Sequence, residues 1–533
     1  MTALEPLGPS VDPSLGALAD AILIPPFPGT TPPPWLLRAL GRGLAGVTLF
    51  GSNMTGDTAA MTATLRDAAI TGGTGAEPVI AIDEEGGDVT RVTYTSGSPY
   101  PGNAALGAVD DVALTRSVYA AIGTDLARLG INTDLAPCAD VLAPDGSLVV
   151  GTRSFGSDPA LVARHVAAAV AGLQSAGVAA CAKHFPGHGS TAGDSHQELA
   201  TVAGTMRDLR VRDLPPFVAA IGAASLAMMP GHLRVPELTG DLPATLSPAA
   251  ITGLLRGELG FDGVVICDAL EMKAASAAFG IPQAAALAVI AGTDLLCLGR
   301  DTDEVMYHAV RSALADAVSS GRLAARRLEE AAARVTRLRA RLAADRDGSG
   351  IAADGAGGAV GAVGAVGAGD GIGLVAARRA LRGSGPVPGP LANPLVVEVE
   401  PEENIAAGRF PWGFEPWADV LRVDVATGDG AVLDDTVLDD TVLDDTVLDD
   451  TVLAHTAAAA VLTAAAGRSL VLAVRDARGV LSLIGEVLAA RPDAVIVEMG
   501  VPVWTPPPGI AYLASYGASR VCAQAVAEAL DLH

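Results

Sequence analysis

The sequence predicts an α/β protein with an N-terminal (β/α)8 barrel of the TIM type and a smaller C-terminal α/β domain with an open sheet. Three observations predict this fold. Short apolar runs alternate with Ala-, Leu- and Arg-rich segments of helical periodicity from residue 20 to residue 300. The runs are almost continuously apolar, as in parallel strands that are covered on both faces. Polar residues follow the runs at their C-terminal ends, the rim at which such a barrel carries its functional side chains.

Eight of these runs are predicted as strands. Each is short, is bounded by Gly or polar residues, and is followed by a segment with helical spacing. Eight strand–helix units in this length fit a closed barrel better than an open sheet. The runs lie at residues 21–24, 46–50, 78–82, 131–135, 178–182, 225–229, 263–266 and 293–298.

Composition predicts the domain boundaries. Residues 1–345 form the predicted barrel domain, which an Arg- and Ala-rich helix at about 321–345 closes. Residues 346–370 are rich in Gly, Ala and Asp, a composition that buries no core and predicts a flexible linker. Residues 371–533 resume the α/β pattern and form the second domain. Its expected elements are a helix at 374–381 and strands at 395–399, 469–474 and 493–497.

An acidic insertion interrupts the second domain at residues 432–451, where Val-Leu-Asp-Asp-Thr repeats four times. This repeat length fits neither helix nor strand, and closely spaced Asp side chains repel one another. The repeat also lacks the Gly turn and the closing Glu of an EF-hand loop, so calcium is not expected. We therefore predict a disordered segment of low complexity.

Overall composition narrows the partners. The 533 residues include 35 basic and 60 acidic side chains, and the net charge of −25 argues against nucleic acid or an anionic membrane surface as partner. The sequence has no run of about 18 uncharged apolar residues, so no membrane span is predicted. At the N-terminus no basic segment precedes an apolar stretch, so no secretory signal is predicted. The scattered Cys residues have no CxxC spacing, which favours buried, reduced thiols in a cytoplasmic protein. We expect no metal, no cofactor, and a monomer or a homodimer.

The densest group of titratable residues is at 183–196, where KHFPGHG is followed by DSH. It has three interpretations: a loop without chemistry, a metal site of His184, His188 and His196, or an acid/base pair of Asp194 and His196. The spacing disfavours the metal, because a Pro lies between His184 and His188 and interrupts the helix on which such a ligand pair normally sits. In the acid/base interpretation, Asp194 holds His196 in one tautomer on a Gly-rich loop.

Further polar residues follow the other predicted strands, and their convergence on one rim predicts a functional site. Structural ion pairs are predicted for Glu84, Glu85 and Asp140. Asp268 is the best candidate for a glycosidase nucleophile, because it ends a buried strand beside small residues that leave room for a sugar. Glu271 is expected to face a helix or to make a structural contact. In strand order the polar residues are Asp83, Glu84, Glu85 and Arg91; Asp134, Asp140 and Arg153; Lys183 and His184; His232; and Asp268.

Six motifs occur in order along the first domain: DEEGG at 83–87 with Arg91, RSF at 153–155, KHFPGHG at 183–189, DSH at 194–196, PATLS at 243–247 and DALEM at 268–272. Together they resemble glycoside hydrolase family 3, specifically its bacterial β-N-acetylglucosaminidase branch. The resemblance covers about residues 15–340. The second domain is similar, more loosely, to the C-terminal α/β domain of two-domain members.

The resemblance implies a retaining, two-step glycosidase without a metal or cofactor. Asp268 would attack the anomeric carbon, and His196, oriented by Asp194, would act as acid and then as base. The implied substrate is a small carbohydrate with a terminal β-linked GlcNAc, from a muropeptide fragment or a chito-oligosaccharide. The implied substrate-binding residues are Asp83, Arg91, Arg153, Lys183 and His184, whereas His188 would serve loop structure.

Three positions depart from the family pattern and concern substrate preference more than reaction type. Asp88 stands where the family often has Arg, Cys267 where a Ser often precedes the nucleophile, and Gln197 where a Leu-Pro ending is common. Two alternatives stay open: a phosphorylase of the same branch, and a catalytically silent sugar-binding barrel. The second domain carries no predicted catalytic residue, so a chain ending near Ala344 is expected to keep some activity.

Overall fold

The structure is a computed structural model that describes residues 12–143, 150–192, 199–202, 204–300, 302–349, 369–386, 389–400, 413–424 and 450–532. Residue contacts divide the chain into two compact units. The first, which we call the barrel unit, comprises Met1–Asp83, Tyr119–Ser147 and Val166–Gly361. The second, the sheet unit, comprises Glu84–Val118, Leu148–His165 and Ala362–His533. The sheet unit therefore takes in two stretches from the first third of the sequence.

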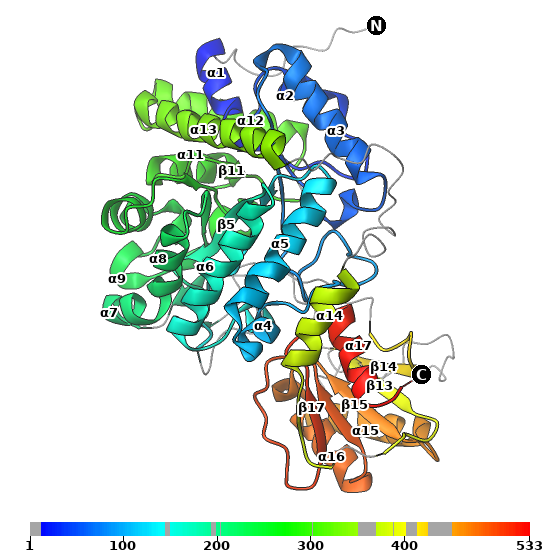
Figure 1. Ribbon diagram of the computed structural model, residues 1–533. Helices are drawn as coiled ribbons and strands as arrows, with labels where there is room; N and C mark the ends of the chain where they lie inside the picture. Colours follow the sequence, from blue (N-terminus) through cyan, green and yellow to red (C-terminus); the bar gives the residue numbers. More distant parts are fainter. Residues whose placement is uncertain are drawn as a thin grey trace, which may run out of the picture. The chain divides into compact units, whose positions relative to one another are not determined.

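Eight parallel strands form the core of the barrel unit (Figure 1). They are β1 (Leu23–Ile24), β2 (Gly46–Thr48), β3 (Val79–Ile82), β4 (Thr133–Asp134), β5 (Ala179–Phe185), β8 (Ala227–Pro230), β10 (Val264–Val265) and β11 (Leu296–Cys297). Six form a sheet in the order β2-β3-β4-β5-β8-β10, and β1 pairs with β11. Ile266 bridges to Leu295, and the Thr48 N–H donates to the Pro25 carbonyl, so that β10 joins β11 and β2 joins β1. Each predicted run overlaps one of these strands, and the barrel fold is confirmed.

Helices cover the outside of these strands (Figure 1). Their starts follow local sequence signals, because Asp57 accepts a hydrogen bond from the Ala60 N–H at 3.0 Å and Asp303 accepts one from the Met306 N–H at 2.9 Å. None of the helices in the described ranges is both long and apolar enough to cross a bilayer. The principal helices are α1 (Pro13–Asp20), α2 (Pro34–Gly41), α3 (Thr58–Ala69), α5 (Val112–Arg128), α6 (Pro159–Ser175), α8 (Leu214–Gly222), η6 (Ala249–Glu258), α11 (Ile281–Ala291), α12 (Glu304–Ser319) and α13 (Ala325–Ser349).

Buried charge at the N-terminal ends of the strands has a structural role. Asp294, which is fully buried just before β11, pairs with Arg256 of η6 and with Arg327 of α13. Arg334, about two turns further along the same face of α13, lies 3.5 Å from the same carboxylate. These pairs hold two helices against the end of the barrel opposite the predicted site, as expected for the stability face of such a fold.

A mixed six-stranded sheet forms the core of the sheet unit, in the order β14-β13-β15-β16-β17-β12. Five strands are parallel, and β12 is antiparallel at one edge. The predicted strands correspond to β13, β15 and β16, whereas β12, β14 and β17 were not expected. The strands are β12 (Arg382–Ser384), β13 (Leu395–Glu400), β14 (Asp419–Asp424), β15 (Leu470–Val474), β16 (Val495–Glu498) and β17 (Ala511–Ala514).

Helices cover both faces of this sheet because its strands are apolar on both sides. Val397 and Leu472 pack with residues of α15 and α16, whereas Val396 and Val471 pack with residues of α17. This alternation along neighbouring strands confirms the predicted open α/β sandwich. The helices are α14 (Gly369–Ala380), α15 (Asp450–Ala464), α16 (Leu481–Ala490) and α17 (Arg520–Ala529).

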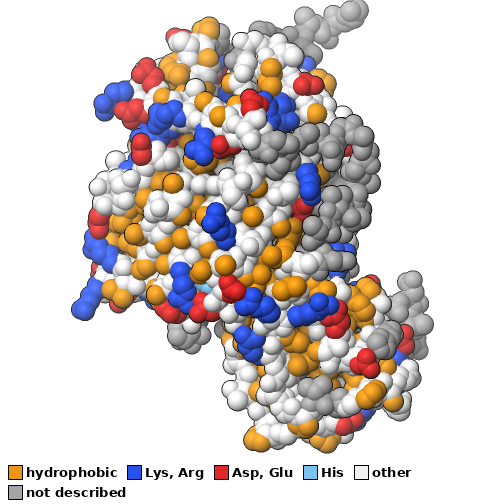
Figure 2. All heavy atoms as spheres, viewed as in Figure 1, with side chains coloured by type: hydrophobic (Ala, Val, Ile, Leu, Met, Phe, Trp, Pro, Cys, Tyr) orange, Lys and Arg blue, Asp and Glu red, His pale blue; other side chains and the backbone are white. Residues whose placement is uncertain are grey.

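Two predicted segments fall mainly outside the described residues. The predicted linker at 346–370 is described only where α13 extends to Ser349 and where α14 begins at Gly369. The acidic repeat at 432–451 is described only from Asp450, the first residue of α15. On the face shown in Figure 2, Lys and Arg side chains lie among Asp and Glu side chains, and their described residues form no continuous basic area there.

Candidate active site

Those predicted site residues of the barrel unit that the structure describes lie at the carboxyl ends of its strands. Asp83 directly follows β3, Lys183 and His184 lie near the end of β5, and Asp268 follows β10 after the bridging residue Ile266. Because all strands of a parallel barrel end at the same rim, their terminal side chains face one region. The barrel closure therefore brings together residues that are separated by up to 185 positions in the sequence.

Lys183 and Asp83 form the central ion pair of this rim. The Lys183 Nζ donates to Asp83 Oδ1 at 2.6 Å, and the Lys183 side chain is 2% exposed while that of Asp83 is 23% exposed. The buried ammonium is thus neutralised by a carboxylate that solvent still reaches. Such a pair presents both a charge-assisted donor and an acceptor to a polyhydroxylated ligand.

The pKa values of two buried thiols, Cys297 and Cys181, are raised in part by nearby carboxylates. Burial raises the pKa of the Cys297 thiol to about 12, and the charges of Asp268 and Asp83 add to this rise. Burial likewise raises the pKa of Cys181, and the same two carboxylates contribute. Asp83 and Asp268 therefore act on one part of the barrel interior, as a shared site requires.

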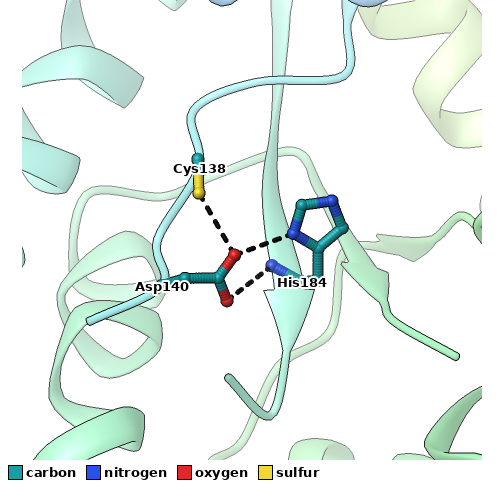
Figure 3. A group of neighbouring side chains, drawn as sticks. All are labelled: Cys138, Asp140 and His184. Atoms are coloured by element: carbon teal, nitrogen blue, oxygen red, sulfur yellow. Dashed lines mark hydrogen bonds and ion pairs between the residues drawn. The ribbon is translucent and has the colours of Figure 1, made fainter. Parts of the chain in front are cut away.

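Asp140 organises the residues around His184 (Figure 3). Its Oδ2 accepts from the His184 ring at Nδ1 (2.8 Å) and from the Cys138 thiol (3.1 Å). Its Oδ1 accepts from the backbone N–H groups of His184 (3.2 Å) and His188 (2.6 Å). Burial by itself would raise the pKa of Asp140, but His184, His188 and these donors hold that pKa below its ordinary value.

This arrangement fixes the state of the His184 ring. A carboxylate accepts at Nδ1, so Nδ1 carries a proton and Nε2 is the ring nitrogen on the side away from Asp140. Asp140, predicted to make a structural ion pair, makes a structural contact with the His184 ring. What the sequence did not reveal is that this pair orients a predicted substrate-binding residue.

Cys138, Asp140 and His184 also have the atom types of a metal site, because their ligand atoms lie within 4.8 Å of one another. Here, however, Asp140 Oδ2 already accepts both the thiol and the imidazole proton (Figure 3). The three side chains therefore satisfy one another as a hydrogen-bonded support for His184, and that role needs no ion.

The loop after β5 is held by close packing. A Cβ at Gly187, whose φ is +132°, would lie 2.6 Å from the Cβ of Asp213. Arg212 pairs with Asp213 and donates to the Ser190 hydroxyl at 2.6 Å. His188 bonds through Nδ1 to the Thr191 hydroxyl at 2.6 Å, which is a contact within the loop itself. The predicted acid/base residues Asp194 and His196 follow this segment and lie outside the described residues.

The segment that carries Asp268 has its own support. His232 is fully buried, and its Nε2 donates to the Ala269 carbonyl at 3.0 Å, while its Nδ1 lies 2.9 Å from the Thr245 hydroxyl. Thr245 belongs to the PATLS motif, whose function the sequence did not explain. The pair therefore fixes the backbone beside Asp268, and only the contact between the segments that follow the neighbouring strands β8 and β10 reveals this.

The two neighbours of Asp268 that drew attention in the sequence are structural. Cys267 is fully buried, and its sulfur accepts a hydrogen bond from the Cys297 N–H at 3.2 Å. Glu271 accepts from the Arg300 N–H at 2.5 Å, which is the structural contact expected for it.

Arg91 and Arg153 belong to the sheet unit, and each is tied to a glutamate. Arg153, 8% exposed, makes a bidentate pair with Glu85 through Nε (2.9 Å) and Nη2 (2.7 Å), which confirms the ion pair predicted for Glu85. Glu84 instead accepts through one oxygen from Thr90, the Arg91 N–H and the Val92 N–H, at 2.8 to 3.0 Å. Burial raises the pKa of Glu84 to about 7 against these hydrogen bonds.

Fold and rim together define an α/β-barrel protein with titratable side chains at the carboxyl ends of its strands, the class to which many barrel enzymes belong. Residues 40–338 match the N-terminal domain of glycosyl hydrolase family 3. The chain therefore belongs to that family. Its similarities place it in the bacterial β-N-acetylglucosaminidase branch of this glycoside hydrolase family, as the resemblance predicted.

Three relatives illustrate the match. Beta-hexosaminidase A of Pseudoalteromonas piscicida is 33% identical over 336 residues, which cover 59% of this chain and 56% of that protein, so the chain spans just over half of that relative's length. Beta-hexosaminidase LpqI of Mycobacterium tuberculosis is 38% identical over 278 residues, covering 51% of this chain and 71% of LpqI. The solved family 3 β-N-acetylglucosaminidase from Paenibacillus sp. FPU-7 superposes with a TM-score of 0.81 at 28% identity, covering 97% of this chain and 96% of that one.

Proposed function

We propose that this protein is an exo-acting, retaining β-N-acetylglucosaminidase that removes terminal β-linked GlcNAc from chito-oligosaccharides or muropeptide fragments. The observation that carries the proposal is the position of Asp268 at the end of a barrel strand, in the same rim as the Asp83–Lys183 pair. Relatives named as β-hexosaminidases and β-N-acetylglucosaminidases support the choice of sugar. Five buried cysteines that form no disulfide support a cytoplasmic location.

In the first step, a carboxylate oxygen of Asp268 attacks the anomeric carbon as the bond to the leaving oxygen breaks. His196, oriented by Asp194, gives its proton to that oxygen. In the second step, a water molecule gives a proton to His196 and attacks the anomeric carbon, which releases Asp268 as a carboxylate. Two displacements retain the configuration of the sugar.

The binding residues have complementary chemistry. Asp83 accepts hydrogen bonds from sugar hydroxyls, and Lys183 donates to a sugar oxygen from its buried position. His184, held by Asp140 at Nδ1, presents Nε2 to the sugar. Arg91 and Arg153 are assigned as further donors to hydroxyls or to the N-acetyl group because of the motifs in which they occur.

The nucleophile is tested by Asp268→Asn, with Glu271→Gln as the matched carboxylate control three residues away. The first variant should lower kcat/KM for an aryl β-N-acetylglucosaminide by on the order of 10³-fold or more, because the amide cannot form the glycosyl-enzyme. The control keeps an acceptor for the Arg300 N–H and should remain active. Unchanged turnover in Asp268→Asn would overturn the assignment.

The same assay separates the alternatives when an aryl β-glucoside is added and phosphate is varied. A product of sugar 1-phosphate that depends on phosphate would make the enzyme a phosphorylase of the same branch. Binding of GlcNAc oligosaccharides without turnover would instead favour a silent sugar-binding barrel.

A further inference from the structure

Two stretches of the family 3 barrel sequence, 84–118 and 148–165, belong to the same compact unit as the C-terminal domain. These stretches carry Arg91 and Arg153. We propose that the C-terminal domain is a positioning element that holds these stretches, and with them Arg91 and Arg153, in the geometry for substrate binding. The inference rests on the proposed function and assigns to the second domain a part in it.

Asp88 joins three segments of the sheet unit. Its Oδ1 accepts from the Ala518 N–H at 2.9 Å, just before α17, and its Oδ2 accepts from the Thr152 hydroxyl at 2.5 Å. Thr152 immediately precedes Arg153. The Asp that replaces the family's frequent Arg at this position thus connects the DEEGG loop and the Arg153 segment to the C-terminal domain.

Glycines of the C-terminal domain allow backbone contact with residues 99–101. A Cβ at Gly373, on α14, would lie 1.9 Å from the Pro99 carbonyl oxygen. A Cβ at Gly517 would lie 2.5 Å from the Pro101 carbonyl oxygen, which also accepts from the Cys522 thiol at 3.6 Å. A side chain at either glycine would force the two segments apart.

Charged contacts extend this attachment to the helix that follows. Arg379 of α14 pairs with Asp111 at 2.9 Å, and Arg382 donates to the Ala108 carbonyl at 2.7 Å. Ala108 lies in α4 (Asn103–Val109), which packs against α14. Exposed pairs of this kind add little stability singly, but here they fix the same segment at several points.

From this attachment, a short series of contacts leads to the two arginines. The Gly87 N–H donates to the Tyr100 carbonyl at 3.0 Å, so residues 99–101 support the DEEGG loop. The Asn103 side chain donates to the Arg153 carbonyl at 2.7 Å. Glu85 of the same loop then holds the Arg153 guanidinium. A displacement at α14 is therefore transmitted to the backbone of both arginine-bearing segments.

The test uses the full chain and a matched pair of glycines on one helix. Gly373→Ala introduces a methyl group against Pro99, whereas a Cβ at Gly371, two residues earlier on α14, meets no atom within 4 Å. Both substitutions favour the helix itself. For an aryl β-N-acetylglucosaminide, Gly373→Ala should lower kcat/KM by about 10- to 100-fold, mainly through KM, and Gly371→Ala should match wild type.

Hydrogen exchange supplies a readout that does not depend on activity. Amides of residues 84–93 and 150–155 should exchange faster in Gly373→Ala than in Gly371→Ala, while the barrel strands exchange alike. If the wild-type protein shows no turnover, the proposed function is wrong. The exchange comparison would still show whether the C-terminal domain holds residues 84–118 and 148–165 in place. A folded Gly373→Ala with wild-type KM and unchanged exchange would overturn the proposal, as would a loss of thermal stability alone.

A second pair covers the case in which Gly373→Ala does not fold. Asp88→Ala removes both acceptors, whereas Asp88→Asn keeps an oxygen for the Ala518 N–H and leaves an amide beside the Thr152 hydroxyl. We expect the alanine variant to raise KM and the asparagine variant to remain close to wild type. Equal kinetics for Asp88→Ala and the wild-type protein would contradict the proposal.

Discussion

Glu84 illustrates how a single carboxylate can be both well bonded and costly. Its side chain is 4% exposed, and three donors converge on one of its oxygens. Removal from water outweighs these hydrogen bonds, so the pKa rises to about 7 from the ordinary 4.5. The Glu84 carboxyl group fixes the loop that carries Arg91. Because the group is buried, its ionisation near neutral pH lowers the free energy of unfolding.

This cost predicts a pH dependence of stability. The folded protein binds the Glu84 proton more tightly than the unfolded chain does, so the resulting stabilisation is complete below pH 4.5 and is lost as the pH rises to about 7. The loss is on the order of 3 kcal/mol. In Glu84→Gln the amide oxygen still accepts the three hydrogen bonds, and this pH-dependent loss should disappear.

The measurement is the midpoint of thermal unfolding at pH 5 and pH 8. The wild-type midpoint should fall more between these values than that of Glu84→Gln, and Glu329→Gln, on an exposed part of α13, should behave as wild type. An equal fall in wild type and Glu84→Gln would show that Glu84 is not responsible.

At the scale of elements, the loop after β4 determines how the end of β5 is used. Asp140 comes from that loop, and its four acceptor contacts hold the His184 ring and the backbone of the next turn together (Figure 3). The hydrogen bonds are concentrated on a carboxylate that is fully buried. Three of the four contacts go to His184 and His188, and one goes to Cys138 in the loop that carries Asp140. Removal of the Asp140 charge should therefore disturb the end of β5 more than the loop after β4.

Asp140→Asn should keep the backbone contacts but turn the acceptor at Oδ2 into an N–H donor, so that the His184 ring can no longer donate from Nδ1 and must accept there instead. We expect KM for an aryl β-N-acetylglucosaminide to rise on the order of 10- to 100-fold. Nitrogen chemical shifts of the His184 ring would report the tautomer directly. Cys138→Ser retains a donor to Asp140 and is the control; an unchanged tautomer in Asp140→Asn would contradict the assignment.

At the scale of the molecule, the two compact units defined by residue contacts do not coincide with the domains predicted from the sequence, whose boundary lies after residue 345. The expectation that a chain ending near Ala344 keeps activity treats residues 1–345 as self-sufficient. In the structure, 84–118 and 148–165 pack within the sheet unit, where Gly373 and Gly517 closely approach Pro99 and Pro101. Removal of the C-terminal domain would expose these packed surfaces and release both arginine segments.

We therefore expect a chain ending at Ser349, the last residue of α13, to lose at least about 100-fold in kcat/KM or to aggregate. Turnover of an aryl β-N-acetylglucosaminide and the mass of the particle in solution check this outcome. A monomeric, folded truncation with wild-type kcat/KM would show that the barrel sequence needs no support from the second domain.

The sequence by itself determined the elements and the candidate chemistry. Apolar runs of strand length are a local property, so all eight barrel strands were found, and so were β13, β15 and β16 of the second sheet. Motif spacing placed Asp83, Lys183 and Asp268 at the ends of the third, fifth and seventh predicted barrel strands. Such a placement requires only that the strand carrying the side chain is recognised. The assignment of Asp194 and His196 stays a prediction.

Only the tertiary structure decided which residues support these side chains and which unit carries them. Asp140 beside His184, His232 and Thr245 beside Asp268, and Asp88 beside Ala518 are pairings between segments far apart in the chain. Hydrogen bonds and close glycine contacts of this kind depend on where distant segments of the chain meet. The local periodicity of the sequence does not predict which segments meet. For this reason the barrel could be predicted from its strands, whereas the attachment of 84–118 and 148–165 to the C-terminal domain could be recognised only from the folded chain.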